Sequence, residues 1–102
     1  MPEPDLIESV VLQSAVDPLV RLSRRQAVAV RYLANGYSAG SAAVALGLSV
    51  RTVTQYLALA RARLGARNAP HLVALAFAHG FVRSDDLRYG SFAGRRWPVG
   101  PA

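Results

Sequence analysis

Three consecutive residues, Gly47-Leu48-Ser49, constrain the fold of this chain most, because they predict a tight turn between two helices. Glycine adopts the positive φ that ends one helix, and the serine side chain caps the first amides of the next. A turn of three residues that contains glycine is typical of a helix-turn-helix unit. The sequence therefore predicts one helix that ends at Leu46 and another that begins at about Val50.

Similar signals predict the elements before this turn. Ser23 and Gln26 have the spacing of a capping box, and the helix that they begin ends before Gly36. Ser38 begins the next, shorter helix, which Gly47 ends. The region before the turn therefore contains two helices.

Two further helices are predicted from the spacing of apolar residues. The helix from about Val50 to Leu64 has an apolar stripe made of Val53, Leu57, Ala60 and Leu64. Residues 71–79 follow Pro70 and form a helix that is apolar nearly all round. Because three short helices cover only part of it, we expect its other side to bind a second subunit. The expected fold class is all-α, with four helices over residues 21–82.

Two extensions flank this domain. In residues 1–20, apolar residues recur at a spacing that predicts an amphipathic helix from Asp5 to about Ala15, ended by Asp17-Pro18 and packed on the core. Residues 83–102 are rich in glycine and proline and are expected to form a flexible basic tail. Within that tail, Arg95-Arg96-Trp97 is a candidate arm for phosphate or the minor groove.

Charged residues are distributed unevenly along the chain. The 102 residues have a net charge of +6, and all twelve basic residues are arginine. Residues 1–17 are acidic, whereas residues 18–84 contain nine arginines and no Asp or Glu. Because this segment lacks internal counter-charges, we expect a polyanion as its partner, with an ordinary solvated basic surface as the alternative.

The third helix has an outward face suited to the major groove of DNA. Arg51, Thr54 and Gln55 supply polar groups in its first turns. Ala58 leaves room for close approach, and Arg61 supplies a cation for phosphate. An ordinary amphipathic surface helix has a similar face, so this pattern alone leaves both interpretations open.

Short motifs between residues 22 and 82 match one known family without a gap. They are Leu22-Ser23-x-Arg25, Leu33-Ala34-x-Gly36-x-Ser38, Ala43-x-x-Leu46-Gly47-Leu48-Ser49, Thr52-Val53, Arg63-Leu64-Gly65-Ala66-Arg67-Asn68, Leu72-Val73-Ala74-Leu75-Ala76 and Gly80-Phe81-Val82. These motifs resemble the DNA-binding domain of the LuxR-type, or GerE-type, helix-turn-helix regulators. The resemblance implies a four-helix transcriptional regulator domain whose third helix enters the major groove and whose fourth mediates dimerisation.

The resemblance also implies site residues. Base reading falls on Thr54, Gln55 and Ala58, and backbone contacts fall on Ser49 and Thr52. The residues expected to contact DNA include these and two arginines of the third helix, Arg51 and Arg61. The full set is Ser49, Arg51, Thr52, Thr54, Gln55, Ala58 and Arg61. The residues expected at the dimer interface are Leu72, Leu75, Ala76 and His79.

Three residues depart from the family pattern. Gln26 and Ser41 stand where acidic residues are usual, which helps to explain the absence of anions from this segment and favours non-specific DNA binding. Tyr56 stands where a histidine is usual. With Gln55 beside it, Tyr56 makes the family's preferred DNA sequences unsafe to transfer to this chain.

Other classes of function are disfavoured. The chain has no Cys, its two histidines lie eight residues apart on one helix, and Asp85 and Asp86 are adjacent, so we expect no enzyme, no metal site and no cofactor. No apolar run is long enough to cross a membrane, and the acidic N-terminus is unlike a secretory signal. We expect a bacterial, cytoplasmic protein without a membrane partner.

Two alternatives remain at the level of sequence. One is the promoter-reading region four of extracytoplasmic-function sigma factors, which residues 31–33, 48–53 and 59–64 resemble. The other is a protein-interaction module that has lost DNA binding. The expected partners are double-stranded DNA and a second copy of the chain, with another regulator or RNA polymerase as further candidates. Only 21 residues precede the first motif, so we expect no receiver or ligand-binding domain.

Overall fold

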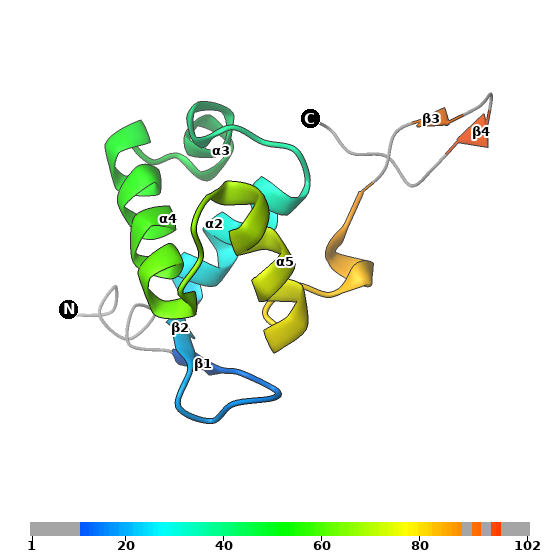
Figure 1. The fold of residues 1–102 in the computed structure, drawn as a ribbon. Helices are drawn as coiled ribbons and strands as arrows, with labels where there is room; N and C mark the ends of the chain where they lie inside the picture. The colour runs from blue at the N-terminus through cyan, green and yellow to red at the C-terminus, as the bar shows by residue number, and fades with distance from the viewer. Residues whose placement is uncertain (1–10, 89–90, 93–94, 97–102) are drawn as a thin grey trace.

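The computed structural model describes residues 11–88, 91–92 and 95–96, and its main body consists of four helices (Figure 1). These are α2 (Arg24–Ala34), α3 (Ala39–Leu46), α4 (Val50–Leu64) and α5 (Ala69–His79). The predicted all-α fold with four helices is confirmed. The short elements around them are β1 (Val11–Gln13), β2 (Arg21–Ser23), the 3-10 helix η1 (Ser84–Asp86), β3 (Ser91–Phe92) and β4 (Arg95–Arg96).

The predicted helix starts are confirmed atom by atom. At the start of α2, the Ser23 hydroxyl accepts from the Gln26 amide at 3.1 Å, and Gln26 Oε1 accepts from the Ser23 amide at 3.0 Å. At the start of α3, Ser38 and Ser41 form the same reciprocal pair, at 3.0 and 2.9 Å. Gln26 and Ser41 therefore complete the caps of α2 and α3 with uncharged side chains.

The turn between α3 and α4 has the predicted geometry. Gly47 has a φ of 70°, and the Leu48 amide donates to the Ala43 carbonyl at 2.9 Å. Ser49 then caps α4 by accepting from the Thr52 amide at 3.0 Å. The two helices are bent by 114° at this turn, an angle typical of a helix-turn-helix unit.

Two small core clusters hold the helices together. In the larger one, α2, α4 and α5 pack against one another (Figure 1), and the fully buried side chains include Leu22, Val30, Ala60 and Leu72. In the smaller one, Val53 of α4 packs against Ala42 and Ala43 of α3. Val53, Ala60 and Leu64 of the predicted stripe are buried and Leu57 is half-buried, so α4 turns its opposite face outward.

The N-terminal extension differs from its prediction. Residues 11–13, expected to be helical, form strand β1, which pairs antiparallel with β2 as Leu12 opposite Leu22. Asp17-Pro18 does not end a helix; it makes the hairpin turn, in which the Asp17 carboxylate accepts from the Leu19 amide at 3.0 Å. Residues 5–10 of the predicted helix lie outside the described residues.

The hairpin is attached to the end of α5. The Ser14 hydroxyl lies 2.7 Å from Nδ1 of His79, and the Ala15 amide donates to the His79 carbonyl at 2.8 Å. The same hydroxyl accepts from the amides of Val16 and Asp17, at 3.0 Å each. Ser14 therefore joins the hairpin turn to the fourth helix.

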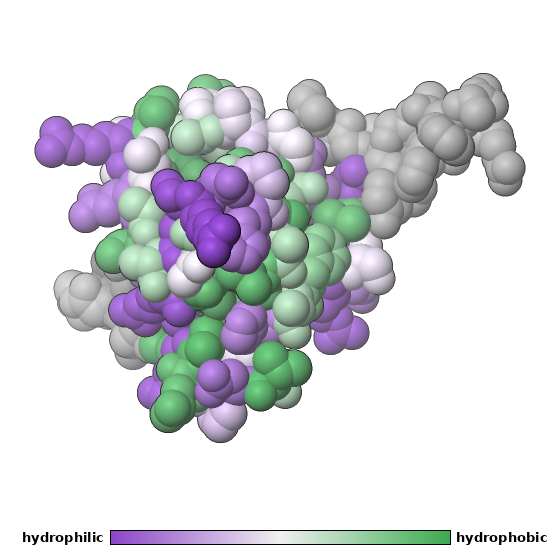
Figure 2. All heavy atoms as spheres, in the orientation of Figure 1, coloured by the Kyte–Doolittle hydropathy of each residue, from purple (hydrophilic) through white to green (hydrophobic). Residues whose placement is uncertain are grey.

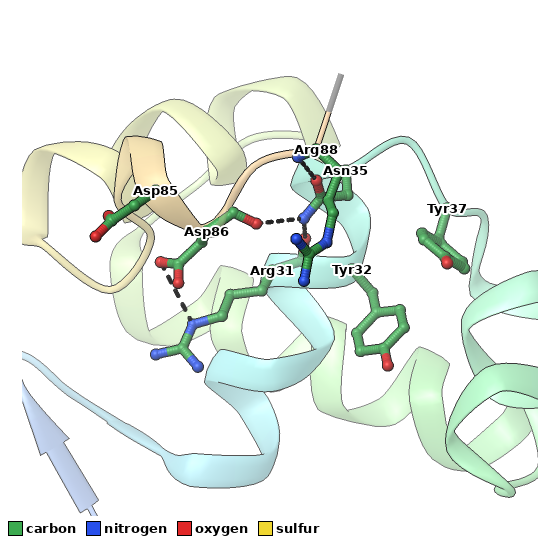
Figure 3. Close-up of a pocket in the computed structure, with 7 residues that line it drawn as sticks. All are labelled: Arg31, Tyr32, Asn35, Tyr37, Asp85, Asp86 and Arg88. Carbon is green, nitrogen blue, oxygen red and sulfur yellow. Dashed lines mark hydrogen bonds and ion pairs between the residues drawn. The ribbon is translucent and has the colours of Figure 1, made fainter. Parts of the chain in front are cut away.

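Part of the predicted tail is also attached to the helices. Residues 83–88 were expected to be flexible, but Asn35, at the end of α2, donates to the Asp86 carbonyl at 3.0 Å and accepts from the Arg88 amide (Figure 3). Arg31 of α2 lies 3.7 Å from the Asp86 carboxylate. The segment 83–88 is therefore held against the end of α2. Trp97 of the candidate basic arm lies outside the described residues, and Arg95 and Arg96 form β4.

Candidate nucleic-acid interface

Helix α4 forms one side of the molecule, on the left in Figure 1. Most of the residues expected to contact DNA lie on the face of α4 that points away from the two cores. Arg51, Thr54, Gln55, Ala58 and Arg61 are all exposed. Their common face follows from the opposite stripe of α4, which is held in the two core clusters. Hydrophilic side chains project from this side of the molecule in Figure 2.

Ser49 and Thr52 lie together at the start of α4. Ser49 is exposed and Thr52 is half-buried, and their hydroxyl oxygens are 2.8 Å apart. One of the two hydroxyl hydrogens makes this contact, so the pair retains one hydroxyl donor for an external oxygen. The N-terminus of a helix also favours an anion nearby. The pair is therefore suited to a phosphate.

Two arginines of α4 donate to backbone carbonyls. Arg61 Nη2 donates to the Arg67 carbonyl at 2.9 Å, and Arg63 Nη1 donates to the Arg21 carbonyl at 3.4 Å. A carbonyl orients a guanidinium without neutralising its charge. Both cations therefore remain available to an external anion.

The other end of the domain has ion pairs with carboxylates. Arg31 pairs with Asp86 and Arg83 pairs with Asp85, each at 3.7 Å, where residues 83–88 meet the end of α2. A hollow of about 290 Å³ lies here (Figure 3), and it is lined by Arg31, Asp85, Asp86, Tyr32, Asn35, Tyr37 and Arg88. Asn35 in the same hollow uses its side-chain amide to hold the segment that follows η1. These polar groups therefore bind one segment of the chain to another, residues 83–88 to the end of α2.

Hollows flank α4 on both sides. One of about 270 Å³ lies between α4 and the first residues of α3 and α5, and Thr54 and Ala58 are at its edge. The other, of about 200 Å³, is lined by Tyr56 of α4 together with Arg24, Arg25, Val28, Leu46 and Leu48. Sequence reasoning did not include Arg24, which is exposed at the start of α2. The pattern of residues on α4 alone could not indicate it, because Arg24 reaches this flank through the packing of α2.

The residues predicted for the dimer interface lie in different environments. Leu72 and Ala76 are fully buried in the larger core cluster, so neither has surface to offer a partner, and these two predictions are wrong. Leu75 and His79 are half-buried, and His79 contacts Ser14 within the chain. The exposed positions of α5 include Ala74 and Ala78. More of α5 is covered than the sequence indicated, because Phe81, Val82 and Leu22 complete the core around it.

The described residues contain neither a cluster for a metal ion nor a single helix that could span a membrane. Among them, no group of three or more His, Asp or Glu side chains is arranged to hold a metal ion. No single helix in this part of the chain is long and apolar enough to span a membrane; α3 and α4 meet that criterion only as a pair, bent at the turn between them.

Most of the helical domain matches a known protein family. The family model GerE, described as bacterial regulatory proteins of the luxR family, matches residues 20–76. The match covers more than half of the chain, and it includes α2, α3, α4 and most of α5. It begins one residue before β2, so β1 and the hairpin turn before Val20 lie outside it, as does η1.

Proposed function

The chain belongs to the luxR family of bacterial regulatory proteins, and we propose that it reads double-stranded DNA with α4 in the major groove and does so as a dimer. Helix-turn-helix domains of this family are DNA-binding transcription regulators and not typically enzymes. The coarse function thus follows from membership. The groove, the residues and the dimer are the proposal.

The observation that carries the proposal is that one face of α4 packs in the cores while the opposite face exposes polar side chains. Its apolar stripe is used in the cores, whereas Arg51, Thr54 and Gln55 are exposed on the outward side. An α-helix fits the width of the major groove, and base edges are read there by polar side chains in the first turns. Gln55 can pair with N6 and N7 of adenine through its amide.

Phosphate contacts would come from both ends of α4 and from its flanks. The Ser49–Thr52 pair offers a hydroxyl donor at the start of the helix. Arg61 and Arg63 offer guanidinium groups further along, held by carbonyls that leave their charge intact. These contacts position a protein on DNA without reading its sequence.

A dimer is supported by the small size of the exposed residues on α5. Ala74 and Ala78 lie one helical turn apart on its exposed side, and small side chains let two helices approach closely. One helix-turn-helix domain buries too little surface for tight specific binding. Two copies related by a two-fold axis would bind an inverted repeat whose half-sites lie about one helical turn apart.

The test is the selection of bound sequences from a random pool of double-stranded DNA, with the full chain at moderate salt. The expected result is an enriched inverted repeat, bound by two copies of the protein. Enrichment of an asymmetric promoter-like element by single copies would instead favour the sigma-factor alternative. A chain that retains no DNA at all would favour the protein-interaction alternative and contradict the proposal.

A further inference from the structure

The outward face of α4 changes character halfway along the helix. Its first half exposes the polar side chains of Arg51, Thr54 and Gln55, with Val50 beside them. Its second half exposes Ala58, Leu59 and Ala62, whose side chains contain no polar atom, alongside the arginines Arg61 and Arg63. Leu59 keeps 42% of its surface exposed. The second half therefore presents methyl groups to the solvent together with two guanidinium groups.

Helix propensity does not explain this strip fully. Alanine and leucine favour helices, but arginine, glutamine and lysine do so almost equally and suit an exposed position better. Cations also lie in the same turns, because Arg61 and Arg63 are exposed there. Apolar groups bounded by cations are complementary to a groove with phosphates along its walls and methyl groups on its floor.

A second observation lies beside Ala58. The hollow of about 270 Å³ on this flank has Thr54, Ala58 and Arg61 at its α4 edge. The other residues that line it are apolar and are Leu33, Ala39, Leu57, Ala69 and Leu72. The Arg61 guanidinium is held by the Arg67 carbonyl. A methyl group that entered here would meet carbon atoms, which favours burial of apolar surface.

We propose that the second half of α4 recognises the C5-methyl group of thymine, with Ala58 at the centre of the contact and Ala62 one turn further along. This inference rests on the proposed DNA-binding function and names what that site reads. Thymine is the base whose methyl group projects into the major groove, where apolar side chains such as alanine contact it. Each half-site then has one part read by hydrogen bonds and another read by methyl contacts.

The experiment uses the DNA site that selection with the full chain provides. Each thymine in turn is replaced by deoxyuracil, which removes the C5-methyl group and keeps base pairing. We expect one or two thymines per half-site at which affinity falls about fourfold, the factor that corresponds to ~0.8 kcal/mol for one methyl group. Thymines outside the half-sites serve as internal controls, with no expected change.

A pair of variants assigns the contact to the protein side. Ala58→Gly removes the methyl group of Ala58, so deoxyuracil at the sensitive position should no longer lower the affinity. Ala45→Gly, at an exposed alanine of α3, has a similar cost in helix propensity and should leave the deoxyuracil effect intact. Circular dichroism checks that both variants remain helical.

Three results would overturn the inference. Specific binding that tolerates deoxyuracil at every position, or a selected half-site without thymine, would refute methyl reading and leave the proposed function standing. A deoxyuracil effect that persists unchanged in Ala58→Gly would move the contact away from Ala58. Failure of the full chain to select any DNA would remove the proposed function and this inference together.

Discussion

Helices α4 and α5 were both expected from the sequence to form interfaces, and the structure uses them differently. In α4 the apolar stripe packs in the cores, and the side chains predicted to contact DNA are exposed except for half-buried Thr52. In α5 two of the four residues predicted to contact a partner are core residues. The difference teaches that a polar face opposite an apolar stripe identifies a free surface, whereas an apolar helix alone does not show which of its sides is covered.

The largest effect is expected from the core side of α5. Leu72→Ala should lower the free energy of unfolding by ~2–5 kcal/mol, because it leaves a cavity among fully buried residues. The measurement is urea denaturation followed by circular dichroism. Leu59→Ala, at an exposed leucine of α4, is the matched control and should change stability little. If Leu72→Ala left the free energy of unfolding unchanged, Leu72 would not be a core residue, and its role at a partner interface would be favoured again.

A large effect on binding is expected from the exposed side of α5. Ala74→Glu introduces a charge on the surface proposed for the dimer, so it should dissociate dimers and abolish most of the specific DNA affinity. Ala45→Glu, at an exposed position of α3, should leave the dimer and the specific DNA affinity unchanged. Sedimentation with and without DNA measures the number of copies. Two copies of the Ala74→Glu variant on each site, at the affinity of the unaltered chain, would exclude this surface.

An intermediate effect is expected where the hairpin meets α5. Ser14→Ala removes the hydroxyl that contacts His79 and accepts from two amides of the turn. Unfolding should become easier by ~1–3 kcal/mol, because part-buried polar groups lose their partner. Thermal denaturation compared with Ser84→Ala, which removes an exposed hydroxyl, checks this. Equal melting temperatures would mean that the hairpin contributes nothing through Ser14.

The smallest effect is expected from single arginines. Arg61→Ala should reduce the slope of log affinity against log salt by about 0.9, the value for one phosphate contact. Arg83→Ala should leave the slope unchanged, since Arg83 pairs with Asp85 at the other end of the domain. Titrations at several salt concentrations give both slopes. An equal change of slope in the two variants would show that the position of an arginine on the domain does not affect its contribution to DNA binding.

Local features of the fold could be predicted from the sequence. The capping pair Ser23–Gln26 involves residues three apart, Ser38 caps α3 from the position just before it, and the Gly47 turn needs only its own backbone conformation. The stripe of α4 follows from helical periodicity, which also indicates the outward face. Each of these depends on residues close in the chain, so the pattern contains the information.

Contacts between distant residues could not be predicted in the same way. Asp17-Pro18 suits the end of a helix and a hairpin turn equally well, and only the pairing of Leu12 with Leu22 decides for the hairpin. Asn35 binds Asp86 across 51 residues, and no local pattern indicates such a contact. The burial of Leu72 likewise depends on residues at both ends of the domain, so its role was mistaken.

The most direct test of the central claim, that α4 reads DNA sequence, is the base preference of the Gln55→Ala variant. Relative affinities for all single-base changes of the selected site are measured for this variant, for the unaltered chain and for Gln13→Ala, which changes an exposed glutamine of β1. We predict that Gln55→Ala loses discrimination of ~1–3 kcal/mol at one position in each half-site, with other positions unchanged and Gln13→Ala without effect. Base preferences identical to those of the unaltered chain at every position would contradict the claim.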